Sequence, residues 1–167
     1  CAENLRTHTY QNGDAITEAA ANEDWTDVGA NEEGAWSNAV HGPVYNWYAV
    51  DDPRNVCPAG WHVPTDEEWT ELVVFLDPLA EPDAEVQSLT AGGPLKSTGT
   101  IQEGTGVWFE PNTGATNESG FSGLPGGSRS NDGNYYNSLG NDGVWWSATE
   151  NQPGLLLCRR LIYDNAG

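Results

Sequence analysis

Positive charge is scarce in this 167-residue chain, which has six Lys and Arg residues against 25 Asp and Glu and a formal net charge of −19. Nucleic acid is excluded as a partner, because binding it requires cations that displace counterions from the phosphates. An anionic membrane surface is disfavoured for the same reason. Such acidity fits a surface kept apart by repulsion, a saline habitat, or a chain that collects divalent cations.

Long apolar runs are also missing. The longest, residues 72–76, is far shorter than the roughly 20 residues that span a bilayer, so we expect no membrane insertion.

Dinucleotide and phosphate loops, HExxH, EF-hand and nucleophile-elbow patterns are absent. Carboxylate pairs occur, as a glycosidase needs, but 25 carboxylates form such pairs by chance. We therefore expect no enzyme.

Histidine and cysteine show no metal-binding spacing. His8, His41 and His62 are scattered, and we expect His62 to pack beside the start of a helix. Three cysteines without a CxxC pair predict no zinc site. One intrachain disulfide can form, with three possible pairings. A chain rich in aromatic residues and Gly and poor in Lys is typical of a secreted protein, in which such a bridge persists.

Aromatic residues and glycine are plentiful, with eight Trp, six Tyr, three Phe and 20 Gly. This content excludes a disordered acidic tail and supplies large side chains for a core. No repeat or linker divides the chain, so residues 1–167 are predicted to form one loop-rich α+β domain.

One segment strongly predicts a helix over residues 66–76. Thr65 and Glu68 have the spacing of a reciprocal capping box at its start. Apolar residues follow at i, i+3, i+4 and i+7 from Trp69 to Leu76, which places them on a single face.

Strands are predicted where β-branched and aromatic residues gather. An Asn-Gly turn predicts a hairpin over residues 7–16, and Trp25 and Trp36 are expected to hold an acidic loop over 17–40 that contains at most one helical turn. The predicted strands cover residues 44–50, 95–98, 107–109, 144–149 and 155–163.

Three blocks of the sequence resemble the Fibrobacter succinogenes major paralogous domain, a family of exported bacterial proteins. They are AENLRT at 2–7, YNWYAV at 45–50 with CPAGWHVPTDEEW at 57–69, and GFSGLPGG at 120–127 with WWSATE at 145–150. The resemblance implies a C-type-lectin-like fold, related to that of formylglycine-generating enzymes. Such a fold has a small twisted antiparallel sheet, one or two helices and long irregular loops. The catalytic cysteine pair of those enzymes has no matching motif here.

The chain departs from the family pattern at both ends. Members usually begin with a strand before the AENLRT block and close with a GFSVRC strand. Because the first and last strands pair in lectin-like folds, we expect another segment or another chain to complete the sheet. We expect a disulfide between Cys1 and Cys158, since both flank predicted sheet edges, with Cys57 left to face a cysteine of the missing strand.

Candidate ligand-binding residues lie in the second half of the chain. Aromatic faces stack on a pyranose ring while amides bond its hydroxyls, which is the chemistry of the segment around residues 134–146. Alternation along the strand places either Trp145 or Trp146 in the core. The candidate set is Asn134, Tyr135, Tyr136, Asn137 and Trp146.

The same region contains hard oxygen donors suited to Ca²⁺. The alternative is that the Asn-Asp-Gly triplets only form turns. The candidate ligands are Asp132, Asn141, Asp142 and Glu150.

The sequence thus favours a non-catalytic, extracellular, lectin-like module that binds a glycan or a surface protein through loops on a rigid scaffold. The alternative is a structural subunit of an extracellular filament or virion assembly, built by strand exchange.

Overall fold

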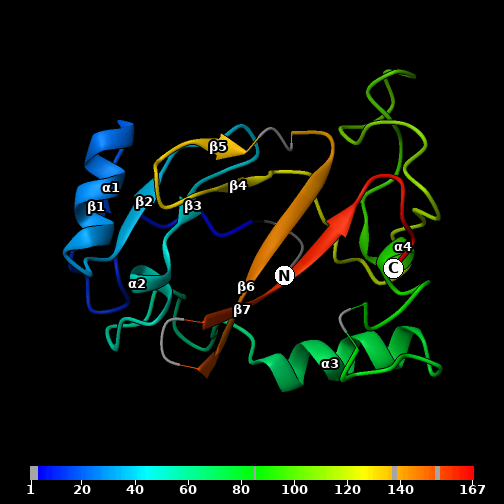
Figure 1. Ribbon diagram of the computed structural model, residues 1–167, viewed down its shortest axis with the longest axis horizontal. Coiled ribbons are helices and arrows are strands. Elements are labelled where there is room, and N and C mark those ends of the chain that lie inside the picture. The colour runs from blue at the N-terminus through cyan, green and yellow to red at the C-terminus, as the bar shows by residue number, and fades with distance from the viewer. Residues whose placement is uncertain (1–3, 85, 137–138, 153–154) are drawn as a thin grey trace.

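The computed structural model describes the whole chain except residues 1–3, 85, 137–138 and 153–154. The described part is a mixed α+β structure, as predicted, with short elements and long connections (Figure 1). Its helices are α1 (Asn22–Ala30), α2 (Trp47–Val50), α3 (Asp66–Leu76) and α4 (Gly92–Leu95). Its strands are β1 (Thr17–Glu18), β2 (Ala35–Ser37), β3 (Val44–Tyr45), β4 (Ser128–Arg129), β5 (Tyr135–Tyr136), β6 (Asp142–Gln152) and β7 (Leu155–Ile162).

The strands form three small sheets. β1 pairs in parallel with β2, and β2 pairs antiparallel with β3. β4 and β5 form one antiparallel pair, and β6 and β7 form another. The β6–β7 hairpin crosses the middle of the molecule, with α1 and the first sheet on one side and the long loops around α4 on the other (Figure 1).

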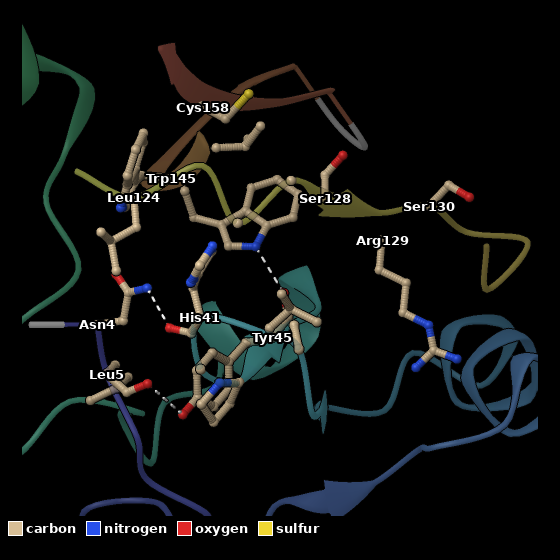
Figure 2. Close-up of a pocket in the computed structure, with 18 of the residues that line it drawn as sticks. Asn4, Leu5, His41, Tyr45, Leu124, Ser128, Arg129, Ser130, Trp145 and Cys158 are labelled. Atoms are coloured by element: carbon tan, nitrogen blue, oxygen red, sulfur yellow. Dashed lines mark hydrogen bonds between the residues drawn. The ribbon is translucent and has the colours of Figure 1, made fainter. Parts of the chain in front are cut away.

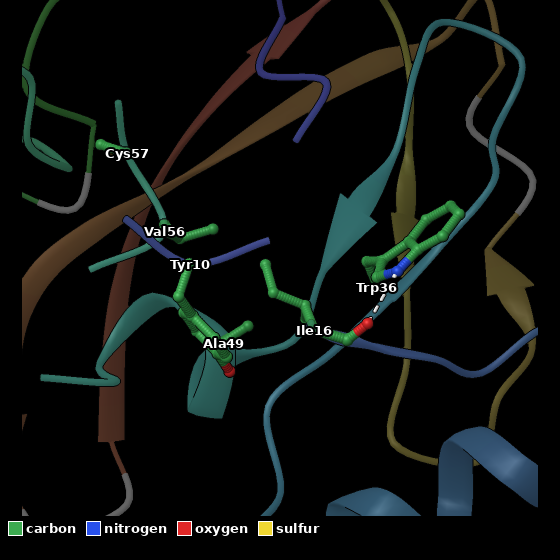
Figure 3. Packing of buried hydrophobic residues seen from close by; sticks show 6 residues of the cluster. All are labelled: Tyr10, Ile16, Trp36, Ala49, Val56 and Cys57. Carbon is green, nitrogen blue, oxygen red and sulfur yellow. Dashed lines mark hydrogen bonds between the residues drawn. The ribbon is translucent and has the colours of Figure 1, made fainter. Parts of the chain in front are cut away.

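The core is divided into three apolar clusters. The first gathers the amino-terminal hairpin, β2 and α2, where the Trp36 indole donates to the Ile16 carbonyl at 3.2 Å (Figure 3). The second joins α1 to the first sheet through Trp25 and Val28. The third packs the inner face of α3 against Trp108 and the β6–β7 hairpin. Each cluster is too small to hold the loops alone, so polar interactions must contribute.

The helix predicted over residues 66–76 is confirmed as α3. The Glu68 amide donates to the Thr65 hydroxyl at 3.2 Å, and the Thr65 amide donates to the Glu68 carboxylate at 2.8 Å, which completes the capping box. Trp69 and Val73 are buried, while Leu72 and Leu76 pack against the third cluster. The predicted stripe is therefore the face that the core covers.

The strand predicted over residues 44–50 is wrong beyond Tyr45, because the chain turns into α2. The Asn46 side chain causes this change of direction. Its Oδ1 accepts from the Ala49 amide at 3.0 Å, which caps α2, and from the Ala35 amide at 2.8 Å. The cap outweighs the strand preference of the flanking aromatic residues.

Other predicted elements are partly right. Trp25 and Trp36 are buried anchors as expected. The acidic segment 17–40, however, contains the nine-residue helix α1 instead of one turn. Residues 95–98 and 107–109 form only isolated bridges, and Leu95 ends α4. The two late strands are confirmed as β6 and β7, which pair with each other.

The only lysine of the chain, Lys96, is fully buried and holds three loops together. Its ammonium group donates to the carbonyls of Thr113 at 2.8 Å, Ile162 at 3.0 Å and Asn165 at 2.6 Å. All three protons of the ammonium group thus have partners. Burial lowers the pKa of Lys96 to about 8, so the group is still mostly charged at neutral pH.

Arg129 plays the same role at the other end of the molecule. Its guanidinium donates to the carbonyls of Ala19 at 2.6 Å and Ala21 at 3.0 Å, which lie just before α1. Its Nε donates to the Gly133 carbonyl at 2.8 Å, and the group lies 4.5 Å from the centre of the Trp25 ring. Arg129 therefore connects the β4–β5 hairpin to the amino-terminal half.

Among the helices that the structure describes, none is long and apolar enough to cross a membrane.

We predict that Lys96→Met lowers the free energy of unfolding by about 3 kcal/mol or more, because three buried carbonyls lose a charged donor. Chemical denaturation measures this loss. Arg6→Met is the matched control, since it removes the same charge from an exposed side chain and should change stability by less than about 0.5 kcal/mol. Equal effects of the two substitutions would contradict the role assigned to Lys96.

We also predict that the ε-methylene NMR signal of Lys96 titrates near pH 8, well below the ordinary lysine value of 10.5. The folded state then releases this proton at a lower pH than the unfolded chain does. Lys96 therefore contributes increasing stability as the pH rises from about 8 to 10.5. A single lysine makes the signal unambiguous, and titration near 10.5 would refute the prediction.

Candidate functional site

A cavity of about 660 Å³, here called the aromatic groove, opens between α3, β6 and the loops at residues 57–64 and 121–124. Its size is that of a typical small-ligand site. Six aromatic side chains line it, which is a large share of the chain's aromatic residues. They are Tyr45, Trp61, Trp69, Phe121, Trp145 and Trp146.

The walls of the aromatic groove are held by packing and hydrogen bonds. The Trp69 indole, which the stripe of α3 directs inward, donates to the Trp146 carbonyl at 3.2 Å. Phe121 meets Trp69 edge-on at 5.7 Å between ring centroids and Trp145 at 5.3 Å. These rings restrain one another, so the groove is preformed.

Trp61 differs from the other aromatic residues because 57% of it is exposed. A turn fixes its backbone, in which the Trp61 amide donates to the Pro58 carbonyl at 2.9 Å. Its indole thus presents apolar surface to solvent at the edge of a cavity, where a ligand can cover it.

Polar groups in the lining of the aromatic groove are oriented by the fold. His62 Nε2 lies 2.8 and 3.0 Å from the two Glu68 carboxylate oxygens. The Thr65 amide, followed by His62, lowers the pKa of Glu68. On the loop, the Ser122 amide donates to Asn117 Oδ1 at 2.8 Å, and its hydroxyl accepts from Asn117 Nδ2 at 2.9 Å. The predicted place of His62 beside the helix start is confirmed.

A second cavity of about 450 Å³, here called the central cavity, shares a wall with the aromatic groove (Figure 2). In that wall the Trp146 indole donates to the Tyr45 carbonyl at 2.9 Å. The side-chain Nδ2 of Asn4 donates to the His41 carbonyl at 2.9 Å, and Figure 2 draws this bond. The shared residues are Asn4, Leu5, Tyr45, Leu124, Trp145 and Trp146.

Burial shifts two titratable groups of the central cavity. It lowers the pKa of His41, which favours the neutral imidazole. It raises the pKa of Tyr45, whose hydroxyl donates to the Thr7 carbonyl at 2.7 Å. His41 and Tyr45 are therefore neutral members of a lining that also includes the Arg129 guanidinium.

Of the predicted ligand-binding residues, Trp146 lines both cavities. Trp145 also lines both cavities and packs against the third cluster, and both tryptophans are half-buried, so the predicted division into one core and one exposed tryptophan does not hold. The Asn134 amide oxygen instead accepts from Asn22 at 3.1 Å, and the Tyr135 hydroxyl donates to the Asn38 carbonyl at 2.7 Å.

Those two side chains thus attach the β4–β5 hairpin to the amino-terminal half. Tyr136 belongs to β5 by its backbone, and Asn137 lies outside the described residues.

The predicted metal ligands do not converge. Asp142 is 3% exposed and accepts from Arg160 Nε at 2.6 Å, while Asp132 accepts from Ser130 and Asn134 within its own turn. Glu150 lies eight residues after Asp142 on β6, a separation of roughly 25 Å at the rise of a strand.

One ion cannot bind both of these carboxylates. Asn141 lies next to Asp142 and has interactions of its own. In the described part of the chain, no three His, Cys, Asp or Glu side chains form a group that could hold a metal ion.

The described cysteines, Cys57 and Cys158, form no disulfide with each other, and the predicted Cys1–Cys158 pair falls partly outside the described residues. Cys158 lies opposite Trp146 in the β6–β7 ladder, and its thiol is free and exposed. Cys57 is a free thiol buried in the first cluster, which raises its pKa. Cys1 lies outside the described residues.

Sequence reasoning missed the aromatic groove because its residues come from segments far apart in the chain. One local signal pointed to it. Trp61 follows a Pro-Ala-Gly turn and stands four residues before the capping box that begins at Thr65, outside the apolar stripe of the predicted helix.

Comparison with known proteins finds no significant match among curated proteins or among solved structures. The family model of the Fibrobacter succinogenes major domain, in contrast, matches residues 1–161. Because this match covers nearly the whole chain and includes every segment that lines the aromatic groove, the protein belongs to the Fibrobacter succinogenes major domain family.

Proposed function

We propose that this protein is a non-catalytic, exported recognition module that binds a glycan in the aromatic groove. The observation that carries the proposal is the exposed indole of Trp61 beside a preformed aromatic cavity. The apolar face of a pyranose stacks on an aromatic ring, and the polar edges of the sugar need hydrogen-bonding groups nearby. His62, Ser122 and Asn4 line the same cavity.

The polar groups of the aromatic groove favour binding over bond-breaking. His62 is engaged with the carboxylate that caps α3, and Ser122 is engaged with Asn117. Groups held in this way can orient a ligand without changing their own partners. We therefore propose recognition of a glycan, or of a surface protein that carries one.

The proposed scaffold is C-type-lectin-like. Small, mostly antiparallel sheets, few helices and long loops support it, together with membership of the Fibrobacter succinogenes major domain family. We propose a location at the cell surface on the same grounds. Ca²⁺ remains a prediction from the turn composition, and the aromatic groove does not require it.

We predict that Trp61→Ala weakens glycan binding at least tenfold, because it removes the exposed stacking face. A glycan array identifies a neutral oligosaccharide ligand, and calorimetry then compares the variants. Phe75→Ala is the matched control, since Phe75 is an exposed aromatic residue of α3 outside the groove. Unchanged affinity of Trp61→Ala, or an equal loss in both variants, would reject the proposed site.

A second candidate function is assembly by strand addition at β7. Six consecutive residues of this strand, 157–162, line one cavity of about 690 Å³, so the cavity follows the edge of the strand. Within the described residues, β7 pairs only with β6. The outer edge of β6, in contrast, is covered by the Gly127 bridge and by the Pro64 carbonyl, which accepts from Ala148 at 2.8 Å.

If strand addition occurs, the wild-type protein should form oligomers whose population rises with concentration in sedimentation velocity. Leu157→Lys should abolish them, because a charge beside an open edge opposes pairing. Leu89→Lys is the matched control on an exposed loop. A monomer at all concentrations would exclude this function.

A further inference from the structure

We infer that the aromatic groove prefers glycans that carry ammonium groups over neutral and anionic glycans. This inference rests on the proposed function and adds a charge class to the ligand. It follows from three features of the structure: the charges in the lining of the groove, the use of the chain's few cations, and the chemistry of an exposed indole.

Among the described residues that line the aromatic groove there is no Lys or Arg, so an anionic sugar finds no permanent counter-charge there. Among the described residues of the lining, Glu68 is the one that is acidic. Its side chain is 44% exposed, and the helix cap holds its pKa low. Glu68 therefore places a fixed carboxylate within the cavity.

The chain's cations are used inside the structure. Five of the six basic side chains have internal partners, and the exposed Arg6 is the remaining one. The five, with their partners, are Arg54 with Asp52 and Asp14, Lys96 with three carbonyls, Arg129 with the carbonyls before α1, Arg159 with Asp66, and Arg160 with Asp142.

The excess of 19 negative charges is thus left for the outer surface, where its field attracts cationic ligands and repels anionic ones.

Trp61 supplies the third feature. The face of an indole is the best aromatic partner for a cation, and the attraction increases when the cation is partly removed from water. Trp61 and Glu68 line one cavity, so a single ammonium group can contact the ring while it is attracted by the carboxylate. An N-acetyl group on the same sugar offers neither interaction.

The test compares two glucosamine hexamers with the same linkage, one N-trimethylated and the other N-acetylated. The first is permanently cationic and the second is neutral. Calorimetry at pH 8 in 50 mM and 500 mM NaCl measures both affinities. We expect the cationic hexamer to bind at least tenfold tighter at low salt, with a smaller difference at high salt. A galacturonic acid hexamer should show no binding.

Glu68→Gln should reduce the preference for the cationic hexamer at least threefold. Glutamine retains the capping box, so α3 stays intact. Glu67→Gln is the matched control, since it removes the same charge one residue away from a side chain outside the lining. Trp61→Ala should weaken binding of both hexamers.

The outcomes separate this inference from the proposed function. Equal or tighter binding of the N-acetylated hexamer overturns the inference and leaves glycan recognition in place. A preference that is undiminished both in Trp61→Ala and in Glu68→Gln also overturns it, because the polycation then binds the surface instead of the groove. Failure of all neutral and charged glycans to bind rejects the proposed function itself.

Discussion

The structure depends on two cations, the buried Lys96 and the half-buried Arg129, that donate to the backbone carbonyls of its loops. Most strands are only two or three residues long, so sheet hydrogen bonds satisfy few of the main-chain groups. Lys96 and Arg129 supply the missing donors, with three for the ammonium group and up to five for the guanidinium. Each joins segments that are distant in the chain. Because so much of the backbone is irregular, individual side-chain hydrogen bonds hold the loops in place, and the small apolar clusters could not do this alone.

This use of the cations determines the charge of the surface. Because the basic side chains face inward or pair with carboxylates, the remaining acidic groups act on solvent and on ligands with little opposition. In the sequence, the scarcity of Lys and Arg argues against nucleic acid and anionic membrane surfaces as partners. Five of the six cations have partners within the fold, and this is one basis for the charge preference proposed for the aromatic groove.

Local signals explain which parts of the fold could be predicted from the sequence. α3 is correct because its capping box and its apolar stripe lie within a dozen residues. The late strands are predicted correctly because aromatic residues in β6 and aliphatic residues in β7 favour an extended chain over a helix. α2 was missed because the aromatic and β-branched residues of 44–50 favour a strand, whereas the Asn46 cap that starts the helix is held in place by a second bond to Ala35, eleven residues away. The groove and the role of Lys96 were missed for the same reason, since both depend on contacts between segments tens of residues apart.

The capping box links the fold to the candidate site. Thr65 and Glu68 start α3, and this start directs Trp69 into the groove wall. The carboxylate that accepts from Thr65 is also the one that holds His62 and faces the cavity. One short motif therefore sets the direction of the helix, the position of an aromatic wall and the charge within the groove. In the proposed site the same side chain would serve the helix start and the ligand charge, and glutamine at position 68 would preserve only the first.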